Sequence, residues 1–192
     1  SQDGKPPLQV QPVDGLTAVD LKLAVASAQV KSALLLAGLY ADGETRVTEP
    51  APTRDHTERM LAAFGAQVGR EGATASVRGG QVLRAARVDV PADISSAAFF
   101  LVAAAICPGS DLVLRHVGMN PTRTGVLHVL RAMGADITES NPQLVGGEPV
   151  ADLHVRGGRL KGITIDPAWV PLAIDEFPAL FIAATCAEDV TE

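Results

Sequence analysis

Hydrophobic residues gather in three long runs, each of which lacks a continuous polar face. The runs cover residues 24–40, 93–107 and 174–186, and polar residues occur near the start of each one. A helix that is apolar on nearly every side is typical of the interior of a large core. We therefore expect three buried helices, each with polar side chains and free backbone N–H groups at its beginning.

Shorter segments between these runs alternate apolar and polar residues or show a helical period. We expect an amphipathic helix at residues 55–64, ended by Gly65, and another at residues 126–133, ended by Gly134. The Gly-Gly pairs at residues 79 and 157 are interpreted as hairpin turns, because no helix follows either pair. Strands are expected at residues 8–11, 16–23, 44–49, 82–90 and 112–117, and a loop at residues 141–148.

Short strings of residues recur in the same order, which indicates an internal repeat. Phe-Gly-Ala-Gln-Val at residue 64 matches Met-Gly-Ala-Asp-Ile at residue 133, and Val-Arg-Gly-Gly occurs at residues 77 and 155. Such self-similarity is typical of a repeated unit, here a buried helix, a strand, a loop, a surface helix and a pair of strands. A third copy begins at Ile174 and is cut short, so we expect the chain to be an internal part of a longer protein.

Composition limits the possible classes of protein. Hydrophobic residues make up 47% of the 192 residues, which is enough for a sizeable core. The net charge of −6, without a run of like charges, argues against binding to nucleic acid. The longest uncharged apolar run, residues 97–107, is too short to span a membrane. Cys107 and Cys186 lie in apolar runs, so we expect reduced thiols and a cytoplasmic location. We expect no metal site, because the sequence has no Cys-x-x-Cys motif and no pair of histidines at metal-binding spacing.

The start of the first apolar helix is a candidate anion site. Ser27 and Gln29 lie at this start, and the backbone N–H groups there favour a phosphate. The alternative is that Ser27 only caps the helix and that Gln29 is a surface residue.

Charged residues at two further helix starts are candidates for contacts with a ligand. Arg54 precedes the first amphipathic helix, where its guanidinium either reaches an anion or forms a salt bridge with Asp55 or Glu58. Asp175 and Glu176 open the third apolar helix. A carboxylate there either orients or deprotonates a hydroxyl group, or serves only as a charged cap.

The remaining polar candidates are interpreted as structural. His56 lies at a helix start with no nucleophile patterned near it, and Arg123 belongs to a segment with good turn chemistry that begins at Asn120. Ser95 and Ser96 open the second apolar helix, where capping is the favoured interpretation.

These strings resemble the 5-enolpyruvylshikimate-3-phosphate (EPSP) synthase family. Ser-Ala-Gln-Val-Lys-Ser-Ala-Leu-Leu-Leu-Ala-Gly-Leu from Ser27, and Thr-Arg-Asp-His-Thr-Glu-Arg-Met-Leu from Thr53, are similar to highly specific motifs of that family. Asn-Pro-Thr-Arg-Thr-Gly and Ile-Asp-Glu-Phe-Pro are similar to its bacterial glyphosate-tolerant branch. The resemblance covers nearly the whole chain, in order.

The resemblance implies an α/β (α+β) fold of repeated βαβαββ units with buried central helices. These units belong to a two-domain enolpyruvyl transferase fold, an inside-out α/β barrel. Residues 1–89 would form the C-terminal part of the first domain, and residues 90–192 the start of the second, truncated within its second repeat. We expect the full-length protein to be a monomer.

The resemblance also implies a reaction and a set of site residues. The family transfers the enolpyruvyl group of phosphoenolpyruvate to the 5-hydroxyl of shikimate 3-phosphate in aromatic amino-acid biosynthesis, without a metal or an organic cofactor. By position, Ser27, Ala28 and Gln29 would hold shikimate 3-phosphate, Ser27 chiefly through its phosphate, and Arg54 would contact the same substrate. Asp175 would contact the ring hydroxyls and is the candidate for the acid/base step. Ala28 departs from family members that have a second serine there, where a backbone N–H still serves.

Several family segments that bind phosphoenolpyruvate have no counterpart in the chain, so we expect the isolated 192-residue chain to be inactive. Two alternatives remain open. One is another enolpyruvyl transferase, such as the enzyme that acts on UDP-N-acetylglucosamine. The other is a catalytically silent binding module built from the same repeat.

Overall fold

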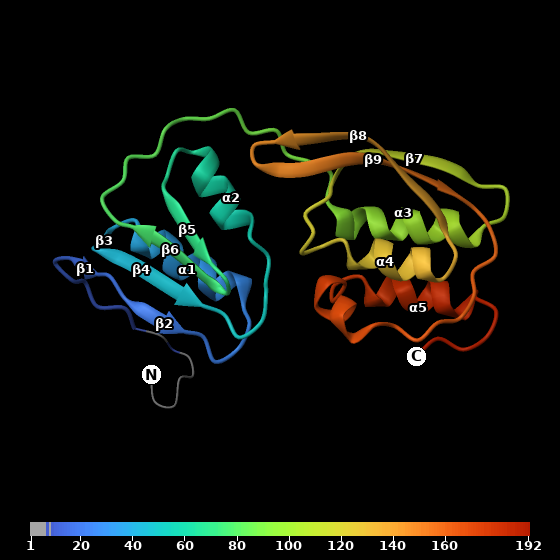
Figure 1. Cartoon of the computed structure of the whole chain (residues 1–192), viewed down its shortest axis with the longest axis horizontal. Helices are drawn as coiled ribbons and strands as arrows, with labels where there is room; N and C mark the ends of the chain where they lie inside the picture. The colour runs from blue at the N-terminus through green and yellow to red at the C-terminus, as the bar shows by residue number, and fades with distance from the viewer. Residues whose placement is uncertain (1–6, 8) are drawn as a thin grey trace. The chain divides into compact units, whose positions relative to one another are not determined.

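Two compact units make up the protein in a computed structural model that describes residue 7 and residues 9–192 (Figure 1). The first unit consists of Ser1–Ala51 and Gly65–Arg84, and the second of Pro52–Phe64 and Ala85–Glu192. The segment that carries α2 (His56–Ala63) thus belongs to the second unit, although strands of the first unit flank it in the sequence.

The first unit is a mixed sheet with one helix. α1 (Ala28–Gly38) packs against β4 (Glu44–Thr48) and β6 (Thr74–Arg78). There Leu35 meets a small core of Val47, Ala75 and Val77. β2 (Asp20–Lys22) runs parallel to β4, whereas β6 pairs in the antiparallel direction with β4 on one side and with β5 (Val68–Glu71) on the other. The four-stranded sheet has the order β2, β4, β6 and β5, and a separate parallel pair joins β1 (Leu16–Thr17) to β3 (Ala41–Asp42).

The second unit stacks a sheet on helices. Its antiparallel sheet has the order β7 (Asp111–Gly118), β9 (Glu148–Arg156) and β8 (Asp136–Val145). The expected loop at residues 141–148 is wrong, because β8 continues to Val145 and only Gly146 and Gly147, both with positive φ, form the turn to β9. Glycine adopts such φ angles without the steric cost that a Cβ would bring.

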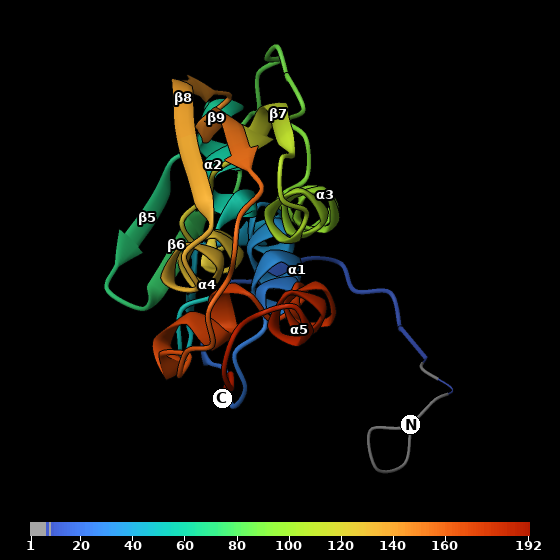
Figure 2. The ribbon, with the colours of Figure 1, turned by 90° about the vertical axis from the view of Figure 1, so that its right-hand side faces the viewer.

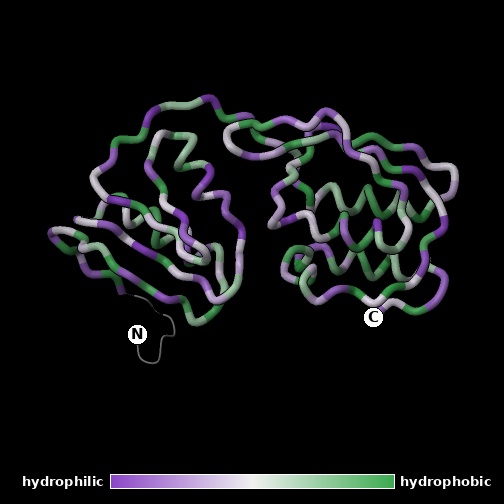
Figure 3. Tube along the Cα trace, viewed as in Figure 1, coloured by the Kyte–Doolittle hydropathy of each residue, from purple (hydrophilic) through white to green (hydrophobic). Residues whose placement is uncertain are grey.

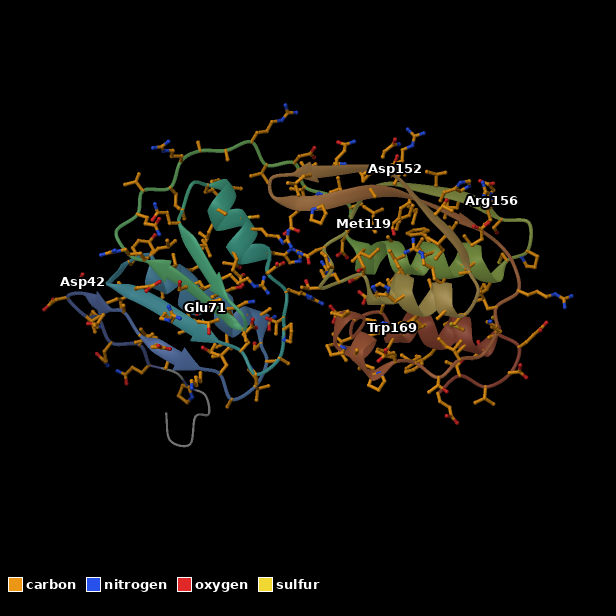
Figure 4. All side chains as sticks on the ribbon, in the orientation of Figure 1. Asp42, Glu71, Met119, Asp152, Arg156 and Trp169 are labelled. Atoms are coloured by element: carbon orange, nitrogen blue, oxygen red, sulfur yellow. The ribbon has the colours of Figure 1, made fainter. Side chains whose placement is uncertain are left out.

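Three helices lie on one side of this sheet, and Figure 2 shows them nearly end-on. α3 (Ile94–Ile106) and α4 (Gly125–Ala132) contact the sheet, and α5 (Phe177–Thr185) contacts both of these helices. Hydrophobic residues follow α3 and α5 along most of their length (Figure 3). The 3₁₀ segment η2 (Pro167–Leu172) places Trp169 (Figure 4) on the ring of His128 of α4, with ring centroids 5.8 Å apart.

The three apolar helices are buried on one side rather than on every side. α1 buries Lys31, Leu35 and Gly38, while α3 exposes Phe99 and α5 exposes Phe181 by more than half. The expected burial on every side is not found, because each helix has neighbours on only part of its circumference. No helix of the described residues has the length and hydrophobicity needed to cross a bilayer.

Two expected strands are absent from the described residues. Residues 9–11 form no strand, and Leu8 lies outside the described part of the chain. Residues 82–90 alternate in polarity, yet they run as an irregular segment in which Val82 and Val90 are exposed. A segment of alternating apolar and polar residues forms a strand only where a neighbouring strand supplies hydrogen bonds to its backbone. Neither segment pairs with such a strand.

The Gly-Gly pairs end a strand and dock on the end of a helix, so their interpretation as hairpin turns is wrong. Gly79 follows β6, and an added Cβ would lie 1.7 Å from the carbonyl oxygen of Ala41, just after α1. Gly157 follows β9 in the same way, and its Cβ would lie 1.8 Å from the carbonyl oxygen of Cys107, the C-cap of α3. The backbone N–H groups of Gly79 and Gly157 each donate to a carbonyl oxygen in the segment after the helix, at 2.9 Å. The recurring string is therefore the point at which each sheet is joined to its helix.

An aspartate holds two bulges of the second sheet. His116 on β7 and Asn141 on β8 both have positive φ, 55° and 51°, where the pairing with β9 shifts register. Asp152 on β9 (labelled in Figure 4) accepts from the backbone N–H of His116 at 2.8 Å and from the side-chain amide of Asn141 at 2.9 Å. These hydrogen bonds, that of Asn141 foremost, lower the pKa of Asp152.

Replacing Gly157 tests the docking of the sheet on the helix. We expect Gly157→Ala to lower the free energy of unfolding of the chain by about 3 kcal/mol, because a rigid carbonyl group occupies the position of the new methyl. The matched control is Gly158→Ala, since no atom lies within 4 Å of its added Cβ. The control should change the free energy by less than about 1 kcal/mol in urea denaturation. Equal effects of the two variants would contradict the assigned role.

Replacing Asp152 tests how the bulges are held. A lowered pKa in the folded protein stabilises it above the unfolded-state value of about 4, and this contribution is lost as the pH falls through the folded-state pKa. We expect Asp152→Asn to lower the thermal midpoint of unfolding at pH 7. The gap, which is the difference in this midpoint between the variant and the unchanged protein, should shrink below about pH 4. Calorimetry across this range measures the gap, with Asp136→Asn as a control on a neighbouring strand. A gap that widens toward acid pH would refute this assignment.

Candidate functional site

The start of α1 is capped by Ser27. This residue has extended backbone angles, and its hydroxyl oxygen accepts from the backbone N–H of Val30 at 3.3 Å. Ala28 and Gln29 are the first two helical residues, and Gln29 is exposed. No acidic residue lies in the first turn. Ser27 therefore caps the helix. Whether it also binds an anion stays a prediction, which rests on the free N–H groups and the positive end of the dipole at a helix start.

A buried ion pair fixes α1 one turn beyond this start. Lys31 is fully buried, and its Nζ lies 2.9 Å from a carboxylate oxygen of Glu49, just after β4. The backbone N–H of Lys31 donates to the carbonyl oxygen of Ser27 at 3.0 Å. A buried charge is tolerated only with a partner. The pair therefore ties the Ser27 turn to the end of β4.

In the second unit, Arg54 and Asp175 are brought together. Arg54 precedes α2, Asp175 precedes α5, and the guanidinium of Arg54 donates to the carboxylate of Asp175. Their side chains are 38% and 50% exposed, so the pair faces solvent. The expected salt bridges of Arg54 with Asp55 or Glu58 are not among those found in the described residues, and Asp55 pairs with Arg59 instead.

A polar cluster anchors α2 to the turn between β8 and β9. Arg59 donates to Asp55 at 2.9 Å and to the carbonyl oxygen of Gly147 at 3.0 Å. The hydrogen bond to Asp55 raises the pKa of Arg59. Asn120 is buried and donates to Asp55 at 2.7 Å, and His56 Nδ1 lies 2.6 Å from Glu148. This cluster fixes the backbone next to Arg54.

A second cluster joins the starts of α3 and α5. Arg123 contacts the carboxylate of Asp93 at 2.8 Å and the hydroxyl of Ser95 at 2.7 Å. The hydroxyl of Ser95 in turn donates to the carboxylate of Glu176, which is 4% exposed. Burial alone would raise the pKa of Asp93, but hydrogen bonds from Ser96 and the charge of Arg123 lower it on balance.

Sequence reasoning missed the role of this second cluster. It treated Glu176 as a companion of Asp175, Ser95 as a cap and Arg123 as part of a turn. In the structure Asp93 is the cap of α3, and Glu176 makes no capping hydrogen bond to its own helix. The available signal was the apolar run after Glu176, because a carboxylate in a buried position requires a partner.

Neither of two cavities in the described residues is lined by Ser27, Arg54 or Asp175. The larger one, about 730 Å³, is lined by Tyr40, Asp42 and Arg78, at the opposite end of α1 from Ser27. A second cavity of about 300 Å³ in the second unit is lined by residues of both polar clusters, with His56, Asn120 and Glu148 from the first and Asp93 and Arg123 from the second. The described residues include no group of three or more His, Cys, Asp or Glu side chains arranged to hold a metal ion.

Comparison with known proteins decides the family. The model of the EPSP synthase (3-phosphoshikimate 1-carboxyvinyltransferase) family matches residues 1–192. The chain belongs to the EPSP synthase family. It is 65% identical over 190 residues to the 3-phosphoshikimate 1-carboxyvinyltransferase of Alkalilimnicola ehrlichii, covering 99% of the chain and 43% of that protein. It is 62% identical to the enzyme of the same name from Methylococcus capsulatus, covering 100% of the chain and 44% of that protein.

Solved structures agree with this assignment. The EPSP synthase from Acinetobacter baumannii matches with a TM-score of 0.92 and 56% identity, covering 100% of the chain and 44% of that structure. The enolpyruvyl transferase NikO from Streptomyces tendae matches with a TM-score of 0.54 at 16% identity, covering 81% of the chain and 36% of that structure, a likeness of fold alone. The predicted α/β enolpyruvyl transferase fold is confirmed, and the chain spans less than half the length of these relatives.

The individual site residues stay predictions. Within the second unit, the structure brings Arg54 and Asp175 into contact. Ser27, Ala28 and Gln29 lie together at the start of α1 in the first unit. Membership of the glyphosate-tolerant branch, suggested by the sequence, also stays a prediction.

Proposed function

We propose that the chain is part of a 3-phosphoshikimate 1-carboxyvinyltransferase and supplies part of its shikimate-3-phosphate site. The full-length protein transfers the enolpyruvyl group of phosphoenolpyruvate to the 5-hydroxyl of shikimate 3-phosphate and releases phosphate. The names and identities of the relatives support the reaction. The contact between Arg54 and Asp175 is the structural observation that carries the site.

The proposed roles follow from the chemistry of each group. Ser27 offers a hydroxyl, and Ala28 and Gln29 offer backbone N–H groups of a helix start, which together suit the phosphate of the substrate. Arg54 offers a planar set of donors to the same anionic substrate. Asp175 accepts a hydrogen bond from a ring hydroxyl and takes its proton in the acid/base step. An exposed Arg–Asp pair adds little to stability, which leaves both side chains available to a ligand.

The proposal extends to organisation and location. Residues 1–89 belong to the first domain of the full-length protein and residues 90–192 to the second. The boundary of the compact units at Arg84 supports this division, although the segment Pro52–Phe64 lies in the second unit. The full-length protein is a cytoplasmic monomer whose partners are its two small-molecule substrates. Its closeness to the glyphosate-tolerant branch is part of the same proposal.

Two substitutions in the full-length protein test the proposed site. We expect Asp175→Asn to lower kcat by about 100-fold, because the carboxamide cannot take a proton. We expect Ser27→Asp to raise the KM for shikimate 3-phosphate by about tenfold or more, because a carboxylate still caps the helix but repels the phosphate. Initial rates measured by phosphate release give both constants. Asp136→Asn, an exposed carboxylate paired with Arg156, is the matched control. Unchanged kinetics in both test variants would refute the site.

The isolated chain should not catalyse the reaction. It spans 43% of the Alkalilimnicola ehrlichii enzyme, and we expect most of the phosphoenolpyruvate site to lie in the remaining part. A coupled phosphate-release assay should detect no turnover above the uncatalysed rate. Normal turnover would show that these 192 residues contain both substrate sites.

A further inference from the structure

Asp175 and Glu176 are consecutive, yet their side chains have different partners. Asp175 contacts Arg54 at an exposed position, whereas Glu176 is buried and accepts from Ser95 of α3. The backbone of Glu176 is also held, because its N–H donates to Ala173 at 3.0 Å and its carbonyl oxygen accepts from Leu180 at 3.0 Å. These contacts of Glu176 thus fix the backbone that follows Asp175.

Arg123 completes this arrangement from the loop before α4. Its guanidinium contacts Asp93 at 2.8 Å and Ser95 at 2.7 Å, so it fixes the hydroxyl that Glu176 uses. The side chain of Arg123 is only 20% exposed. Three segments are therefore joined by charged and hydroxyl groups at the starts of α3 and α5. We call this set, Asp93, Ser95, Arg123 and Glu176, the relay cluster.

Burying a carboxylate costs free energy, because the charged group loses its contacts with water. Replacing a buried ionic group with an apolar side chain of similar volume is often neutral or stabilising, so packing alone does not require Glu176. A cluster of charged, hydrogen-bonded groups holds its side chains in one arrangement, because each donor must lie at a fixed distance and angle from its acceptor. A reacting group displaced by about 1 Å loses much of its effect on the rate.

We infer that the relay cluster positions Asp175 for the acid/base step. Arg123 orients Ser95, Ser95 holds Glu176, and Glu176 fixes the backbone from which Asp175 reaches the substrate hydroxyl. Ser95, Arg123 and Glu176 are positioning residues in this scheme and do not touch the substrate. The inference rests on the proposed function, because it gives Asp175 a role in the reaction.

Neighbouring serines provide a matched pair of variants for a test in the full-length protein. Ser95→Ala removes the hydroxyl between Arg123 and Glu176, while Ser96→Ala removes a hydroxyl whose one hydrogen bond within the described residues goes to Asp93, at 3.0 Å. We expect Ser95→Ala to lower kcat by roughly tenfold with little change in the KM for phosphoenolpyruvate. Ser96→Ala should keep kcat within about twofold. Ser95→Thr, which retains a hydroxyl, should restore most of the rate.

A double-mutant cycle separates positioning from general stability. If the relay acts through Asp175, then Ser95→Ala should change kcat by less than about twofold when Asp175→Asn is already present. An equal loss in both backgrounds, or equal effects of Ser95→Ala and Ser96→Ala, would overturn the positioning role while leaving the proposed function intact. If Asp175→Asn alone leaves kcat unchanged, the proposed role of Asp175 fails, and the positioning role fails with it.

Discussion

The close contact between a strand-ending glycine and the end of a helix is the constraint on which both units depend. At Gly79 and at Gly157 the backbone approaches a carbonyl group so closely that no side chain fits between them. The helix is therefore held at its C-terminal end by the last strand of its own sheet. The start of the same helix, one helix length away, is thereby placed at a fixed position relative to the sheet, and it is there that the polar residues gather.

The three apolar helices, α1, α3 and α5, begin with different polar residues. α1 begins with a serine cap and has no acidic residue in its first turn, which suits an anion. α3 begins with the carboxylate of Asp93, which is occupied by Ser96 and Arg123. α5 begins with two carboxylates, of which Glu176 points to α3 and Asp175 to Arg54. The same structural unit thus begins with an uncharged serine cap in one copy and with carboxylates in the others.

Burial separates the supporting charges from those available to a ligand. Lys31 with Glu49, and Glu176 with Ser95, are withdrawn from solvent and tie helix starts to neighbouring elements. Arg54 and Asp175 remain half exposed, where an ion pair adds little stability. Removing a buried partner leaves an uncompensated charge and costs stability, whereas the exposed pair can exchange its contact for one with a substrate. The buried groups therefore hold the geometry, and the exposed groups are the ones that the proposed site uses.

Local pattern was enough to predict the helices and the repeat, and the resemblance to known motifs predicted the family, but neither predicted the partners of the charged side chains. The amphipathic helices at α2 and α4 and the cap at Ser27 follow from periodicity and capping, which act over a few residues. The expected strand at residues 82–90 failed because a strand needs a neighbour that the local sequence cannot supply. Arg54 meets Asp175 across 121 positions of sequence, and Ser95 meets Glu176 across 81. Only packing of the helices on the sheet selects such pairs, because several nearer carboxylates satisfy the same charge rules. The sequence by itself determined which residues carry charge at helix starts, and the tertiary structure decided which of those charges are buried and which stay exposed to solvent.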